Sequence, residues 1–210
     1  HGARRYFSAH RLQVSLLKNR LRLAVTEGLL YSGLYREIDW TYVTPFLSYY
    51  GAQINSQDMA NMFGTVDIWA MPVNGLQIYA SLLIDDIQVE KTGPIDLEPD
   101  AIGWMWGMVY AGLLPGMEFD AEYVRVTNRT YTTPKSWETF LYRNQPLGHP
   151  MGNDFDHWEF GAAKWAGASF WGRLSYIQTR HGEGGLYKPF DMPWMDYTVE
   201  EGYSEPFPTG

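Results

Sequence analysis

Hydrophobic and polar residues alternate with a period of two along most of the chain. The alternation is clearest over 117–128, where residues 117, 119, 121 and 123 are apolar or aromatic and residues 118, 120 and 122 are acidic. A period of two places successive side chains on opposite faces of a β-strand. The pattern therefore predicts eight strands, with a short helix as the only expected helical element, within 45–60. The predicted strands cover residues 5–17, 21–31, 60–71, 76–90, 101–113, 117–128, 155–165 and 168–181.

Short and long connections alternate strictly between these strands. Tight turns are expected at 18–20, 72–75, 114–116 and 166–167. The intervening segments are long, and they cover residues 32–59, 91–100, 129–154 and 182–210. In an antiparallel meander, this alternation puts every long segment at the same end of the sheet.

The stretch 101–117 also fits a different reading, because it is uncharged and carries Gly103 and Gly107 at the GxxxG spacing of some membrane helices. However, the stretch contains four glycines and Pro115, and both residue types disfavour a helix interior. Leu113–Gly116 has the composition of a turn. A hairpin is therefore the better prediction for this stretch.

The predicted strands are about 11–15 residues long, whereas strands in soluble sheets average roughly 5–6 residues and a strand crosses a bilayer in about 9–11. Short turns at one end and long loops at the other are typical of bacterial outer-membrane barrels. We therefore predict an all-β fold, an antiparallel meander of long strands that is part of a transmembrane outer-membrane β-barrel. Both ends of the chain fall on the long-loop side. We accordingly expect residues 1–210 to be a single barrel segment of about eight strands from a larger barrel, with 182–210 as an extracellular loop or tail.

The composition argues against nucleic acid as a partner and against cysteine chemistry. The chain has 16 basic and 24 acidic residues, a net charge of −8, and no basic stripe, so nucleic acid is not expected as a partner. It has no cysteine, which excludes disulfides, thiolate metal sites and cysteine nucleophiles. The mean hydropathy of −0.31 does not argue against a barrel, because alternation leaves half of each strand polar.

Four motifs occur in an order that resembles the capsule-assembly (Wzi-like) outer-membrane protein family. They are Ser8–Leu12 (SAHRL), Leu82–Asp86 (LLIDD), Gln145–Gly152 (QPLGHPMG) and Arg180–Gly184 (RHGEG). The PLGHPxG segment is the most specific of the four, and the resemblance spans roughly residues 8–184. It implies a large outer-membrane barrel without enzymatic activity, whose characterised members help to attach capsular polysaccharide. The family's barrel has more than eight strands, and its helical periplasmic plug has no counterpart in this sequence.

The acidic row Glu118, Asp120 and Glu122 is the main candidate for residues that line the lumen of the barrel. A hydrated barrel interior is normally polar, so the row needs no ligand to account for it. Asp85 and Asp86 are adjacent on a strand and should face opposite sides, which argues against an acid–base pair. A second cluster contains His149, Asp154, Asp156 and His157, but its spacing matches no metal motif. We therefore expect no catalytic residue, no metal and no cofactor.

Aromatic residues in the long segments are the candidates for glycan binding, since exposed rings can stack on sugar faces. The alternative is that these rings pack the loops or dock another chain. The candidates selected for a ligand are Trp137, Tyr142, His149 and Trp194, and further loop aromatics are Tyr187, Phe190 and Tyr197.

These observations predict a non-enzymatic protein in the outer membrane of a diderm bacterium, with its long loops extracellular. It is expected to take part in the attachment or assembly of capsule or exopolysaccharide, with the lipid bilayer and surface polysaccharide as partners. Two alternatives are a structural barrel subunit held with other chains in a larger surface assembly, and a soluble β-sandwich that binds carbohydrate.

Overall fold

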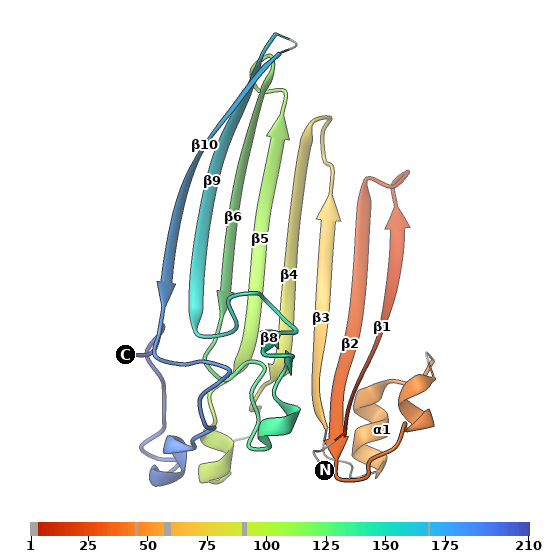
Figure 1. Ribbon diagram of the computed structural model, residues 1–210, viewed down its shortest axis with the longest axis vertical. Helices are drawn as coiled ribbons and strands as arrows, with labels where there is room; N and C mark the ends of the chain where they lie inside the picture. The colour runs from red at the N-terminus through yellow and green to blue at the C-terminus, as the bar shows by residue number, and fades with distance from the viewer. Residues whose placement is uncertain (1–3, 45, 57–59, 90–91, 168) are drawn as a thin grey trace.

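The computed structural model describes residues 4–44, 46–56, 60–89, 92–167 and 169–210 (Figure 1). Eight long strands form one antiparallel sheet in which neighbours along the chain are neighbours in space. The eight predicted strands and the four predicted tight turns are therefore confirmed. The strands are β1 (Arg4–Leu16), β2 (Leu21–Gly33), β3 (Asn61–Ala70), β4 (Leu76–Asp86), β5 (Ala101–Ala111), β6 (Met117–Val126), β9 (Phe155–Ala166) and β10 (Phe170–His181).

The sheet is open. Strands β1 and β10 form its two edges, and no ladder joins them within the described residues. β1 runs towards the tight turns and β10 runs away from them, so the two edges are antiparallel (Figure 1).

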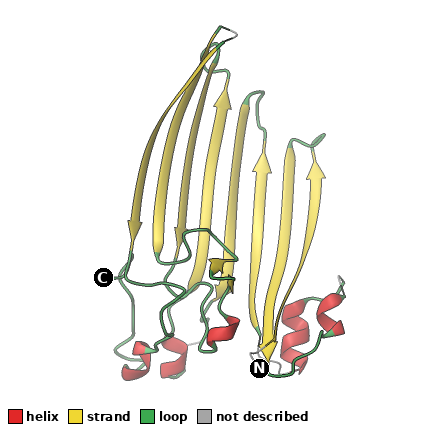
Figure 2. Cartoon of the chain, viewed as in Figure 1, coloured by secondary structure: helices red, strands yellow, loops and turns green. Residues whose placement is uncertain are grey.

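Short elements gather at the end of the sheet opposite the tight turns (Figure 2). Helix α1 lies where the sequence predicts a short helix, whereas the small hairpin of β7 and β8 is not predicted. Among the described residues, the helices lack the length and the apolar character that crossing a membrane requires. The short elements are η1 (Trp40–Val43), α1 (Tyr49–Ser56), η2 (Pro94–Leu97), η3 (Ser136–Glu138), β7 (Leu141–Tyr142), β8 (Gln145–Pro146) and η4 (Pro193–Asp196).

The register keeps the alternation in phase from strand to strand. Val66 of β3, for example, is paired with Val25 of β2 and with Leu82 of β4. One side of the sheet, the apolar face, therefore carries large hydrophobic side chains on every strand, and each of the following is between 40% and 78% exposed: Leu12, Val14, Leu16, Leu23, Val25, Val66, Ile68, Ile78, Leu82, Trp106, Phe160, Leu174 and Tyr176.

The opposite side, the polar face, carries the larger cluster of buried hydrophobic residues at its loop end. There Phe140 is fully buried in a cluster that includes Val124, Val126 and Phe155 from the sheet. A second cluster lies on the apolar face, where Leu29 and Tyr31 of β2 are covered by Tyr42 and Tyr49. Both clusters of buried hydrophobic side chains in the described part of the chain thus lie at the loop end, and most of the length of the strands has one bare apolar face.

Candidate functional site

The polar face carries a network of charges that links three strands. Arg173 of β10 donates to both carboxylate oxygens of Asp120 on β6, at 2.6 and 2.8 Å, and to Glu159 of β9 at 3.0 Å. Gly161 lies directly opposite Asp120, and a Cβ there would come within 2.4 Å of the carboxylate. The absence of a side chain at residue 161 therefore leaves the space that the ion pair occupies.

The predicted acidic row belongs to this network. Glu118, Asp120 and Glu122 share the polar face, and Phe119 lies on the opposite side of the strand. Glu122 accepts a hydrogen bond of 2.5 Å from the Tyr79 hydroxyl. Further along the same face, Arg11 pairs with Asp67 at 2.5 Å, so the carboxylates are partly neutralised by neighbouring strands.

The residues considered for a metal site are not brought together. Asp156 pairs with Arg180 and accepts from Tyr123 on the apolar face, while His157 projects to the other side and contacts Thr179 Oγ1 at 2.8 Å. Asp154 instead accepts the backbone N–H groups of Gly184 and Thr209, at 2.7 and 3.0 Å. Within the described part of the chain, no group of three or more His, Asp or Glu side chains is arranged to hold a metal.

The glycan-binding candidates separate into exposed and buried rings. Trp137 and Tyr142 are 49% and 59% exposed on the segment that covers the polar face. The His149 ring packs against Phe155 at 4.7 Å between ring centres. Burial, and secondarily the charge of His157, lowers the pKa of His149, so its imidazole is neutral at pH 7.

Trp194 is buried, whereas the sequence predicts an exposed ring that is available to a glycan. Its side chain is 0% exposed, with the Arg129 guanidinium 4.9 Å from its ring and Phe190 and Tyr203 beside it. A ring without a free face cannot stack on a sugar, so the prediction that Trp194 is available to a glycan is wrong. The Trp194 ring instead packs within the tail 182–210, as the alternative interpretation of the loop aromatics predicts.

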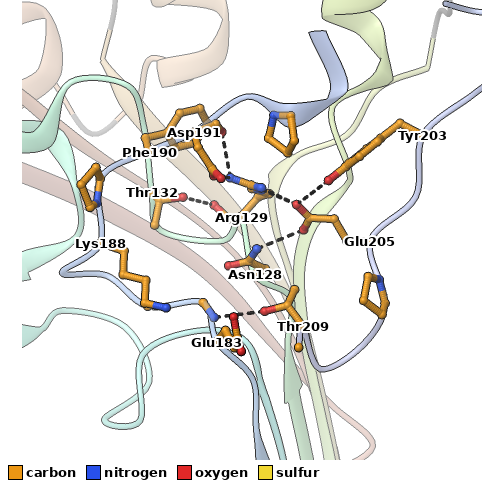
Figure 3. A pocket seen from close by; sticks show the side chains of 16 residues that line it. Asn128, Arg129, Thr132, Glu183, Lys188, Phe190, Asp191, Tyr203, Glu205 and Thr209 are labelled. Atoms are coloured by element: carbon orange, nitrogen blue, oxygen red, sulfur yellow. Dashed lines mark hydrogen bonds and ion pairs between the residues drawn. The ribbon is translucent and has the colours of Figure 1, made fainter. Parts of the chain in front are cut away.

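Arg129 organises a cleft that the sequence did not reveal (Figure 3). The cleft has a volume of about 420 Å³ and lies between the segment that follows β6 and the tail 182–210. Arg129 Nε donates to Glu205 Oε1 at 3.0 Å, and Nη1 donates to Asp191 Oδ1 at 2.7 Å. Asn128 Nδ2 reaches the other Glu205 oxygen at 3.1 Å.

The Arg129 side chain is almost completely buried. The side chain is 7% exposed. Burial alone would lower its pKa, but the hydrogen bonds to Glu205 and Asp191 outweigh burial and raise the pKa above its ordinary value. These partners lie 76 and 62 residues further along the chain, and no local pattern marks such a pair. The guanidinium therefore ties the tail to the segment that follows β6.

We expect Glu205→Ala to lower the free energy of unfolding by about 3–5 kcal/mol, because it leaves a buried cation short of its main partner. Asp191→Ala is the matched control. Asp191 is 74% exposed, so its removal should cost less than about 1 kcal/mol. Urea titration of both variants, with limited proteolysis of the tail, measures the difference. Equal losses in the two variants would contradict the assignment of Glu205 as the main anchor.

Glu98, beside this cluster, predicts a pH dependence of stability. Burial raises its pKa to about 7, with the Asp86 and Glu205 carboxylates adding to the effect and Arg129 opposing it. The folded state then keeps a proton that the unfolded chain releases near pH 4.5. The free energy of unfolding should therefore fall as the pH rises from 4.5 towards 7. Glu98→Gln should flatten this slope in urea titrations across the window; an unchanged slope would count against the raised pKa.

Comparisons with known proteins agree with the resemblance of the sequence motifs. The family model described as "Capsule assembly protein Wzi" matches residues 1–205. Comparison with curated proteins and comparison with solved structures found no match. Since the family match covers nearly the whole chain, the chain belongs to the Wzi capsule assembly protein family.

Proposed function

We propose that this chain is part of an outer-membrane β-barrel that takes part, without catalysis, in attaching or assembling polysaccharide at the surface of a diderm bacterium. Membership of the Wzi capsule assembly family supports the involvement in capsule assembly. The bare apolar face of the sheet is the observation that carries the membrane location.

The height of the apolar face supports a bilayer as the partner of that face. On β9, Trp158, Phe160 and Ala162 are the apolar-face positions between Asp156 and Lys164. Eight residues of strand span about 27 Å at about 3.4 Å each. At the usual strand tilt of about 35–45°, this corresponds to a height of about 19–22 Å, slightly less than the apolar band of about 25 Å found on outer-membrane barrels.

The polar face is what the interior of a water-filled barrel requires. Its ion pairs between Arg173 and Asp120, and between Arg11 and Asp67, satisfy charges that have no place in lipid. Because long segments and tight turns lie at opposite ends, the orientation usual for such barrels puts the turns in the periplasm and the cleft outside. Trp137, Tyr142 and the Arg129 cleft then share the extracellular side.

The two alternatives fit less well. A soluble β-sandwich would have to hide its apolar face, yet large hydrophobic side chains are exposed on seven of the eight long strands of this sheet. A structural subunit of a larger surface assembly is compatible with the same membrane location, and it differs only in having no contact with glycan. The polysaccharide test below distinguishes it.

Val66→Arg should destabilise the protein in lipid by about 2–4 kcal/mol, because it puts a charge near the middle of the lipid-facing band. Thr65→Arg is the matched control. It lies one residue away on the polar face, beside the Asp67 carboxylate. Folding titrations into vesicles of defined lipid measure both variants. Equal tolerance of the two substitutions, or a wild-type chain that is soluble without detergent, would defeat the membrane assignment.

The glycan contact is proposed for the exposed rings of Trp137 and Tyr142. The Arg143 guanidinium lies 5.3 Å from the Tyr142 ring, which puts a hydrogen-bond donor beside an apolar surface. Each ring that stacks on a sugar contributes about 0.5–1.5 kcal/mol beyond the area it buries. The double variant Trp137→Ala and Tyr142→Ala should weaken retention of surface polysaccharide and leave the protein folded.

Polysaccharide retained on the cell surface, compared with the amount of folded protein in the outer membrane, measures this effect. Tyr187→Ala serves as the control, since Tyr187 is also exposed but donates its hydroxyl to the backbone of Asn144. Unchanged retention in the double variant favours the purely structural subunit.

A further inference from the structure

The segment between β2 and α1 presents a concentrated apolar surface. Eight large residues within residues 34–50 are exposed by between 48% and 93%, and Phe46 is the most exposed of them. Together they are called the 34–50 patch: Leu34, Tyr35, Ile38, Trp40, Val43, Phe46, Leu47 and Tyr50. So much exposed hydrophobic area marks an interaction surface.

The segment is fixed to the apolar face of the sheet by a chain of aromatic contacts. The Tyr31 ring of β2 lies 5.1 Å from the Tyr42 ring, which lies 5.9 Å from Tyr49 at the start of α1. Tyr31 also accepts the backbone N–H of Asp39 through its hydroxyl at 3.1 Å. The Tyr31 side chain lies on the same face of the sheet as that of Val25. The patch is therefore on the side of the sheet that is proposed to contact lipid.

The position of the segment along the strands matches the edge of the apolar band. Leu29, which the segment covers, is eight residues from Leu21 at the tight turn, or about 27 Å along the strand. Asp156 is eight residues from Lys164, near the turn between β9 and β10. Measured from the turns, the segment therefore begins at the height where charged residues end the apolar band on β9.

A charged pair beneath the segment indicates the same height. Glu27 lies on the apolar face two residues nearer the turn than Leu29, within the band. It contacts His10 Nε2 at 3.0 Å, and it accepts from Ser48 Oγ at 2.8 Å and from Tyr49 N–H at 2.9 Å. A carboxylate that faced lipid without partners would be costly, so the segment shields Glu27 while it exposes its own apolar side chains outward.

We propose that the 34–50 patch inserts into the headgroup region of the outer leaflet and anchors the barrel at that interface. The inference rests on the proposed function, because it needs the apolar face to be in a bilayer. Trp and Tyr prefer this depth, since their rings are apolar and their polar atoms reach water. Of the three charged residues in the segment, Arg36 and Asp39 pair at 3.3 Å, and the exposed Glu37 leaves one net negative charge, which the hydrated headgroup region accommodates and the hydrocarbon core does not. The patch also continues the sheet's apolar face, which favours lipid over a separate protein partner.

Single-cysteine labelling tests this directly, because the chain contains no cysteine of its own. Phe46→Cys and Trp40→Cys report on the patch, Val66→Cys reports on the apolar face, and Tyr142→Cys reports on the exposed cap over the polar face. Each variant is labelled with an environment-sensitive fluorophore and folded into phosphatidylcholine vesicles without other proteins. Quenching is measured with iodide in the water and with nitroxides attached to the lipid headgroup or deep in the acyl chain.

We expect the two patch positions to lose iodide quenching and to be quenched most by the headgroup nitroxide. Val66→Cys should be quenched by the deep nitroxide, and Tyr142→Cys by iodide. If Val66→Cys responds to the deep nitroxide while both patch positions respond to iodide, the anchor is overturned and the membrane location stands. If Val66→Cys itself responds to iodide, the proposed function fails as well. Patch positions that neither quencher reaches would mean that a second copy of the chain covers them, which also overturns the anchor.

Discussion

The whole structure depends on keeping one alternation in phase across eight strands. Along much of the sheet the ladders keep apolar residues in one row, as where Val25, Val66 and Leu82 are paired across three strands. A shift of one residue in any ladder would exchange the two faces of every strand beyond it. The sheet therefore has one largely apolar face and one that carries most of the charges.

At the loop end, short segments cover each face of the sheet, although no second layer of secondary structure packs along the described strands. On the polar face, Phe140 and Phe155 supply the packing, and beyond the end of β6 the buried Arg129 holds the tail through Glu205. On the apolar face, tyrosine rings hold the segment that leads into α1. Each cap buries only a few side chains. The strands between the caps and the turns gain their stability from the backbone ladder and from their surroundings.

The sequence predicts the parts of the fold that local periodicity encodes. Alternation over 117–128 marks β6, and Pro115 with Gly116 marks its turn, because strand and turn preferences act over a few residues. The pairing of Arg129 with Glu205 could not be predicted, since it joins distant loop positions whose side chains are common in any loop. Trp194 shows the same limit, because an aromatic residue in a polar loop has the same local signature whether its ring is exposed or packed under a tail. The small hairpin of β7 and β8 was missed because its two-residue strands are too short to alternate.

The charges on the polar face act on the register as well as on solvation. Arg173 of β10 reaches Glu159 on the adjacent strand β9 and Asp120 on β6, the strand beyond it, so one guanidinium ties three strands together. If β10 slipped by one residue against β9, Arg173 would move to the apolar face and leave two carboxylates without their cation. That arrangement is unfavourable in water and far more so in lipid, where a charge at the middle of the band costs about 2–4 kcal/mol.

Apolar alternation alone tolerates a slip of two residues, because a two-residue slip restores the faces. The ion pairs do not tolerate it, since the opposite charges would be about 7 Å out of step along the strand. Hydrophobic patterning thus selects the face, and the ion-pair network selects the register within it.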